Sequence, residues 1–171
     1  MIIKPDNEML SYSGRIDFDD RLAPVLVYAC SSIGMKFTGT SLKAVIANHR
    51  SCWTNELGYF IDGEQKRFTL SSDEEKKTYT LAEGLSEGTH ELLLFKRMDS
   101  CHTFTFYGFE IDDGAKVLPL PEKPKRKMEF FGDSVSCGEV SEAVEYVGKP
   151  DPEHDGEYSN SWYSYAWMTA R

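Results

Sequence analysis

Short runs of β-branched and aromatic residues alternate with polar turn residues over the first two thirds of the chain. Such runs favour strands, and the Gly, Asp, Asn and Ser clusters between them favour turns. The strands that we expect lie at residues 25–28, 33–37, 42–47, 59–61, 67–70, 78–81, 90–96 and 103–106. No helix of useful length is predicted before residue 120. The pattern therefore predicts an all-β jelly roll or β-sandwich.

Two local signals refine this prediction. Asp62-Gly63 separates two of the runs and predicts a type I′ hairpin turn, in which both central residues need a positive φ. The alternation changes phase between Phe106 and Phe109, and Gly108 at that point predicts a β-bulge.

The character of the chain changes after residue 118. Residues 119–127 hold three prolines and four basic residues, which is typical of an extended linker. We expect a β-sandwich domain at 1–118, this linker at 119–127, and the truncated beginning of a second domain at 128–171.

The second domain is expected to open with a strand at 128–131, a turn, and a helix over 159–171. Asn160 or Ser161 can cap that helix. Its expected packing face consists of Trp162, Tyr165, Ala166 and Thr169. A strand, a turn and a helix form the opening unit of a parallel α/β domain, and one unit alone cannot bury both of its faces.

The charge balance disfavours some partners. A formal net charge of −9 and a pI near 4.9 argue against nucleic acid and anionic membranes. No apolar run approaches the length of a transmembrane helix. The N-terminus lacks the features of a secretory signal, so the protein either stays in the cytoplasm or has lost such a signal. The sequence does not determine the oligomeric state.

The four cysteines are Cys30, Cys52, Cys101 and Cys137. They contain no Cys-x-x-Cys pair, so a structural zinc site has little support. We favour thiols over disulfides, and the sequence implies no metal and no organic cofactor.

Gly132-Asp133-Ser134 follows the apolar run at 128–131. This arrangement places a serine hydroxyl at the carboxyl end of an expected strand, where α/β sheets bind their ligands. The tripeptide alone is more often an ordinary turn. A serine nucleophile also needs a base and a group that orients the base, and few residues follow Ser134.

Residues 131–138 resemble the first block of the SGNH (GDSL-type) hydrolases. The order of β-sandwich, Pro-rich strap and this block resembles the acetyl-xylan esterases of carbohydrate esterase family 2. Within the sandwich, the resemblance rests on residues 14–15, 33–42, 59–63 and 88–97.

The resemblance implies roles for four residues. Ser134 would be the nucleophile, and its backbone N–H would donate to the oxyanion hole. Asp133 would brace the turn, and Gly132 and Gly138 would permit tight backbone turns. We expect the other oxyanion donors and the catalytic histidine, in an Asp-x-x-His pattern near the end of the complete domain, to lie outside this chain. The 171 residues alone are then expected to be inert or nearly so.

Aromatic residues and histidines are further candidates for the site. Trp53 is the best sandwich residue for contact with a ligand or with the hydrolase domain, whereas Tyr59 and Phe60 are expected to be buried. His154 is interpreted as a solvent-exposed loop residue. Structural roles suffice for the remaining histidines, which are His49, His90 and His102.

The resemblance predicts a carbohydrate O-deacetylase that acts on acetylated polysaccharide or oligosaccharide by serine acyl transfer. Two alternatives stay open. One is a carbohydrate-binding β-sandwich without catalysis, for which Trp53 would matter and Ser134 would not. The other is an SGNH esterase that acts on lipid or aryl esters.

Overall fold

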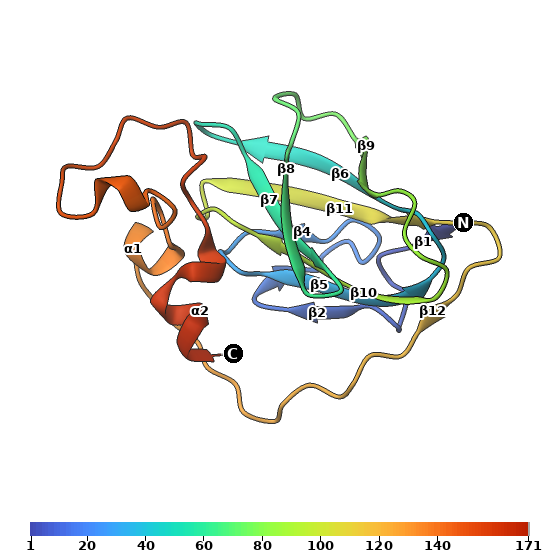
Figure 1. Cartoon of the computed structure of the whole chain (residues 1–171). Coiled ribbons are helices and arrows are strands. Elements are labelled where there is room, and N and C mark those ends of the chain that lie inside the picture. Colours follow the sequence, from blue (N-terminus) through green and yellow to red (C-terminus); the bar gives the residue numbers. More distant parts are fainter. Residues whose placement is uncertain (171) are drawn as a thin grey trace.

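Two antiparallel sheets face one another in the computed structural model, which describes residues 1–170 (Figure 1). The strands of the first sheet are β1 (Ile2–Ile3), β3 (Ile16–Asp17), β4 (Val25–Leu26), β6 (Leu42–Arg50), β9 (Lys77–Ala82) and β11 (His102–Ile111). Those of the second are β2 (Ser11–Ser13), β5 (Ser32–Thr38), β7 (Glu56–Ile61), β8 (Glu64–Thr69), β10 (Thr89–Lys96) and β12 (Val117–Leu118). The predicted β-sandwich is confirmed.

The order of strands explains where the core lies. The first sheet runs β3-β4-β11-β6-β9 with β1 added to β11, and the second runs β12-β5-β10-β7-β8 with β2 added to β5. The central strands alternate apolar side chains toward the space between the sheets, where they are buried. Completely buried members of this core include Leu26, Ile33, Met35, Phe37, Leu42, Ile46, Leu94, Phe104, Phe106 and Phe109.

Both local predictions in the sandwich are confirmed. Asp62 and Gly63 have φ values of 52° and 86°, and they join β7 to β8 as a two-residue hairpin. The β11–β6 register shifts between Phe106 and Gly108, where Gly108 has a φ of 127°. A side chain at Gly108 would collide with the carbonyl of Ile3, because β1 pairs with β11 directly beside this position.

The strand expected at 128–131 does not form. Residues 119–133 run in an extended, exposed path along the sandwich to its other end (Figure 1). No strand within residues 1–170 pairs with this segment, and an unpaired strand has no ladder to satisfy its backbone groups. Its Glu129 side chain contacts Arg15 at 2.5 Å. The proposed domain limits at 118 and 127 stay a prediction.

The tail (residues 134–170) consists of loops and short helices at one end of the sandwich. The helices are α1 (Ser134–Cys137), η1 (Val144–Tyr146), η2 (Ser161–Tyr163) and α2 (Tyr165–Ala170), of which η1 and η2 are 3₁₀ helices.

The single helix expected over 159–171 is wrong, and Arg171 lies outside the described residues. Ser164 is extended, with a ψ of 148°, and separates η2 from α2. Asn160 does cap η2, because its side chain accepts from the Trp162 N–H at 3.1 Å. The break changes the helical phase, so Tyr165 and Thr169 are exposed whereas Ser161, Ser164 and Ala166 are buried.

Candidate active site at the junction of sandwich and tail

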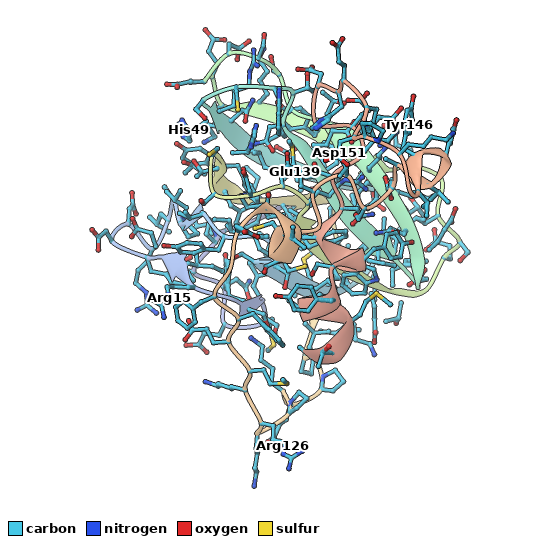
Figure 2. The ribbon with its side chains drawn as sticks, turned by 90° about the vertical axis from the view of Figure 1, so that its left-hand side faces the viewer. Arg15, His49, Arg126, Glu139, Tyr146 and Asp151 are labelled. Atoms are coloured by element: carbon cyan, nitrogen blue, oxygen red, sulfur yellow. The ribbon has the colours of Figure 1, made fainter. Side chains whose placement is uncertain are left out.

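The tail packs across one end of the two sheets. Figure 2 faces this end and shows the tail crossing in front of the sandwich strands, with Glu139 near the centre. Three groups of contacts hold the tail in place. They are an ion pair made by a buried arginine, a set of hydrogen bonds to the end of β10, and an aromatic cluster.

Ser134 is the first residue of α1 and is exposed. The preceding Asp133 caps the helix, because its Oδ1 accepts a hydrogen bond from the Val135 N–H at 3.1 Å. No residue in 1–170 hydrogen-bonds to the Ser134 hydroxyl. The hydroxyl therefore projects from a capped helical turn at the surface.

Two glycines permit the close backbone packing around this turn. Gly138 ends α1 with a φ of 75°, and a side chain there would approach the Asn160 carbonyl oxygen to 2.7 Å. A side chain at Gly132 would collide with the Ser136 hydroxyl, which itself lies 2.8 Å from the Tyr165 hydroxyl. A residue with a side chain would therefore disturb the packing at either position.

A buried guanidinium joins the tail to β10. Arg97, which is 2% exposed, donates to Glu142 Oε2 at 2.7 Å. Asn160 donates to the other oxygen of Glu142, also at 2.7 Å. The backbone carbonyl of Arg97 accepts from the Ser161 N–H at 2.9 Å. Glu142 thus connects the turn after α1 with the segment that leads into η2.

The neighbouring Lys96 is also buried. Its ammonium group donates to the Met98 carbonyl at 2.6 Å and to the Asp99 carbonyl. Burial lowers the pKa of Lys96 to about 7, because the charged form loses its hydration. The Lys96 carbonyl accepts from the Ser161 hydroxyl at 2.6 Å, so the same residue also anchors the tail.

Aromatic rings complete the junction. The ring of Trp162 lies 4.4 Å from Phe60 and 5.3 Å from Phe95, measured between centroids. Phe60 is therefore half-buried beneath the tail, whereas Tyr59 is buried in the sandwich and donates to the Leu81 carbonyl at 2.9 Å.

Trp53 lies at the same junction. Its ring is 4.5 Å from the His154 ring in the tail and is stacked 6.1 Å from the His102 ring. The next residue, Thr54, donates its N–H to the Asp155 carbonyl at 3.1 Å. Trp53 and Thr54 thus both contact the tail.

His154 is not the exposed loop residue that the sequence suggested. Its side chain is only 10% exposed, because Trp53 covers it. Its Nδ1 accepts from the Gly156 N–H at 3.1 Å, and its Nε2 lies 3.9 Å from Glu139. Charged neighbours in the sequence suggested exposure, and a packing partner about a hundred residues away could not be seen there.

Asp-x-x-His does occur within the chain, although the family's pattern was expected outside it. It occurs twice, at Asp99–His102 and Asp151–His154. Neither histidine is hydrogen-bonded to Ser134. The other two histidines have structural partners in the sandwich. His90 lies 2.6 Å from Asp62, and His49 lies 3.0 Å from the Thr105 hydroxyl.

Cys52, Cys101 and Cys137 carry free thiols. Burial raises the pKa of the Cys137 thiol, so this residue is a poor nucleophile despite its position three residues after Ser134. Within residues 1–170, no three His, Cys, Asp or Glu side chains gather to hold a metal ion. In the same part of the chain, no helix is both long and apolar enough to cross a membrane.

The sequence did not reveal the residues that hold the tail. Lys96, Arg97 and Glu142 are not predicted as contact residues, because two consecutive cations at the end of an apolar run are typical of a strand that ends at the surface. No sequence pattern pairs Arg97 with Glu142.

The chain thus forms a β-sandwich with a tail that packs across one of its ends. The family model described as carbohydrate esterase 2 N-terminal matches residues 12–121. The chain belongs to carbohydrate esterase family 2.

Relatives with known names support the same assignment. The cellulase/esterase CelE of Acetivibrio thermocellus is 33% identical over 167 residues, covering 97% of this chain and 19% of that protein. The acetylxylan esterase / glucomannan deacetylase of Cellvibrio japonicus is 26% identical over 148 residues, covering 82% of this chain and 40% of that protein. The chain thus spans less than half the length of either relative.

Solved structures share the fold. A family two carbohydrate esterase from Clostridium thermocellum, in complex with cellohexaose, aligns with a TM-score of 0.81 and 30% identity. The alignment covers 94% of this chain and 47% of that one. The acetyl xylan esterase Est2A from Butyrivibrio proteoclasticus aligns with a TM-score of 0.82 at 19% identity, covering 99% and 45% of the two chains. At that identity the likeness concerns the fold alone.

Proposed function

We propose that the complete protein is a carbohydrate O-deacetylase in which Ser134 is the nucleophile. The observation that carries this proposal is the exposed Ser134 hydroxyl at the start of α1, in a chain of carbohydrate esterase family 2. The relative named acetylxylan esterase / glucomannan deacetylase supports acetylated polysaccharide or oligosaccharide as the substrate.

The reaction would proceed by acyl transfer. Ser134 Oγ attacks the acetyl carbonyl and forms an acetyl-enzyme, the sugar hydroxyl leaves, and water then releases acetate. The Ser134 N–H has no acceptor within residues 1–170, as expected in the first turn of a helix. It is thus available to donate to the oxyanion that develops in the transition state.

We propose that the base that takes the proton of Ser134 belongs to a part of the complete protein outside these 171 residues. The proposal keeps residues 1–118 as the sandwich, 119–127 as the linker and 128–171 as the beginning of the hydrolase domain. The chain alone is then expected to release no acetate, because no histidine in 1–170 bonds to Ser134.

The test is acetate release from acetylated xylan by the protein encoded by the complete reading frame, compared with its Ser134→Ala variant. We expect the rate to fall at least about a thousandfold, as when other serine nucleophiles are removed. Ser136→Ala is the matched control. Ser136 lies two residues after Ser134 in α1, and its hydroxyl is hydrogen-bonded to the Tyr165 hydroxyl. Retained activity in Ser134→Ala would disprove the assignment.

The sandwich offers a second candidate function, which is carbohydrate binding without catalysis. A family 35 carbohydrate binding module shares its fold, with a TM-score of 0.55 at 13% identity. Calorimetric titration of the 171-residue chain with cellohexaose would test this candidate. Binding that is lost in Trp53→Ala and kept in Ser134→Ala would support it, and an absence of binding heat would refute it.

A further inference from the structure

A cysteine, a histidine and an aspartate form a chain of hydrogen bonds at the end of the sandwich that contacts the tail. None of the three is hydrogen-bonded to Ser134. His102 Nε2 lies 3.8 Å from the sulfur of Cys52. On the other side of the ring, His102 Nδ1 lies 2.9 Å from Asp99 Oδ1. The three residues come from the start of β11, the turn before it and the loop after β6, which are held together by the pairing of His102 with Arg50.

The arrangement fixes the histidine. His102 is completely buried, and the Trp53 ring is stacked on it. An ionised carboxylate can only accept hydrogen bonds, so Nδ1 carries the proton that faces Asp99. Nε2 then presents its lone pair to the Cys52 sulfur. Asp99 is itself held, because its Oδ1 also accepts from the Cys101 N–H at 3.0 Å.

The thiol is accessible, and one cation lies against the same loop. Cys52 is exposed. Arg50 donates to the carbonyls of Cys52, at 3.3 Å, and of Trp53, at 2.8 Å, which places its guanidinium against the same loop. Reactive cysteines occur in partly exposed sites next to a histidine or another cation, because the thiolate is the nucleophile.

We propose that Cys52 is a nucleophilic thiol, activated by His102 and Asp99, and a site of modification by low-molecular-weight disulfides. His102 Nε2 accepts the thiol proton, and the Cys52 thiolate attacks one sulfur of the disulfide. The disulfide bond breaks, and the leaving thiolate takes the proton from the imidazolium. Cys52 is oxidised to a mixed disulfide, and the other half of the reagent is reduced to a thiol.

Cys101 provides an internal comparison. It is also exposed, and it lies in the turn beside His102, but no imidazole hydrogen-bonds to its sulfur within residues 1–170. Exposure alone would therefore give the two thiols similar rates. Activation by His102 would act on Cys52 only.

The first experiment treats the folded chain with glutathione disulfide and follows each cysteine by peptide mass spectrometry. We expect Cys52 to react at least about tenfold faster than Cys101, because only its sulfur has a base in reach. Equal rates, or a faster Cys101, would overturn the proposal without any variant.

Two variants then separate activation from exposure. Asp99→Asn keeps the shape of the side chain but removes the charge that orients His102, and we expect the Cys52 rate to fall about tenfold while the Cys101 rate stays constant. Arg50→Gln, at an exposed position, is expected to lower the Cys52 rate by about threefold. An unchanged Cys52 rate in both variants would contradict activation. If Asp99→Asn unfolds, the reaction rates of Cys101 and of the partly buried Cys137 rise together. In that case the test rests on the ratio of the Cys52 and Cys101 rates in the wild type and on the Cys52 rate in Arg50→Gln.

Discussion

Arg97 at the end of β10 and Glu142 in the tail form a hydrogen-bonded ion pair, 2.7 Å long, between residues that are far apart in the sequence. Arg97 is 2% exposed and the Glu142 side chain is 31% exposed. The sandwich therefore contacts the tail that contains Ser134 directly. It supplies the charge that fixes the loop after α1, and with it the position of the helix that begins at Ser134.

Arg97→Met is expected to destabilise the fold by about 2–3 kcal/mol, because it removes the cation that hydrogen-bonds to Glu142 and leaves only Arg67, at 3.8 Å, beside that carboxylate. Arg15→Met is the matched control. The Arg15–Glu129 pair is exposed on both sides, so its loss is expected to cost less than about 1 kcal/mol. Urea denaturation measures both, and limited proteolysis should cleave the tail of Arg97→Met first. Equal stabilities for the two variants would mean that the Arg97–Glu142 pair stabilises the fold no more than the exposed Arg15–Glu129 pair does.

The sandwich was predictable because local pattern and burial agree there. Alternating apolar residues identify the long strands, and Asp62-Gly63 and Gly108 need backbone conformations that the sequence announces. The sequence did not predict β1, β2, β3 and β12. Each has only two or three residues, and its pairing depends on the strands beside it rather than on its own sequence.

The candidate site was predictable only in part. The Gly-Asp-Ser turn can be found by its sequence, and the structure places it on a capped helix. The prediction of a strand at 128–131 was wrong, because a segment with strand propensity forms no sheet without a neighbouring strand to pair with. The contacts of Arg97, Trp53 and His154 join distant segments, and no periodicity reports such pairs.

The pair of His90 and Asp62 should make stability depend on pH. The hydrogen bond from His90 to Asp62 raises the pKa of the imidazole above 6.5. Burial alone would raise the pKa of Asp62, but hydrogen bonds from His90 and the Glu91 N–H outweigh it, and the pKa is lowered below 3.8. The stabilisation is thus fully present below the unfolded pKa of His90 and above that of Asp62. It is lost as pH rises through the folded pKa of His90 or falls through that of Asp62.

His90→Gln should therefore lower the Tm more at about pH 5.5 than at about pH 9, where the wild-type imidazole is neutral. Lys96 contributes with the opposite sign, because its pKa is lowered to about 7 and the folded state gains stability above that pH. For this reason the measured quantity is the difference in Tm between wild type and variant, in which the contribution of Lys96 cancels. A difference that does not change with pH would show that the pair is not ionised in the folded state.

Two serines at the junction should respond differently to the same substitution. Ser161 is 1% exposed, donates to the Lys96 carbonyl at 2.6 Å and accepts from the Cys30 thiol at 3.0 Å. Ser161→Ala removes both of these buried hydrogen bonds and is expected to cost about 1–2 kcal/mol. Ser134→Ala removes an exposed hydroxyl without a hydrogen bond in residues 1–170, so its effect is expected to stay within about 0.5 kcal/mol.

Chemical denaturation of the two variants separates a structural serine from a chemical one. If Ser134→Ala were as destabilising as Ser161→Ala, loss of esterase activity in that variant could be explained by unfolding. A neutral Ser134→Ala makes the activity test under the proposed function decisive.

Gly58 leaves room for the ring of Phe95, which packs against Trp162 in the tail. A side chain at Gly58 on β7 would collide with this completely buried ring, which in turn contacts Trp162 at 5.3 Å. Gly58→Ala is therefore expected to cost about 2–3 kcal/mol by overpacking and to shift the fluorescence of Trp162. In a Phe95→Ala background the ring is absent, so the further cost of Gly58→Ala should fall below about 1 kcal/mol. An equal cost in both backgrounds would show that strain in the β7 backbone, and not the contact with Phe95, requires glycine at this position.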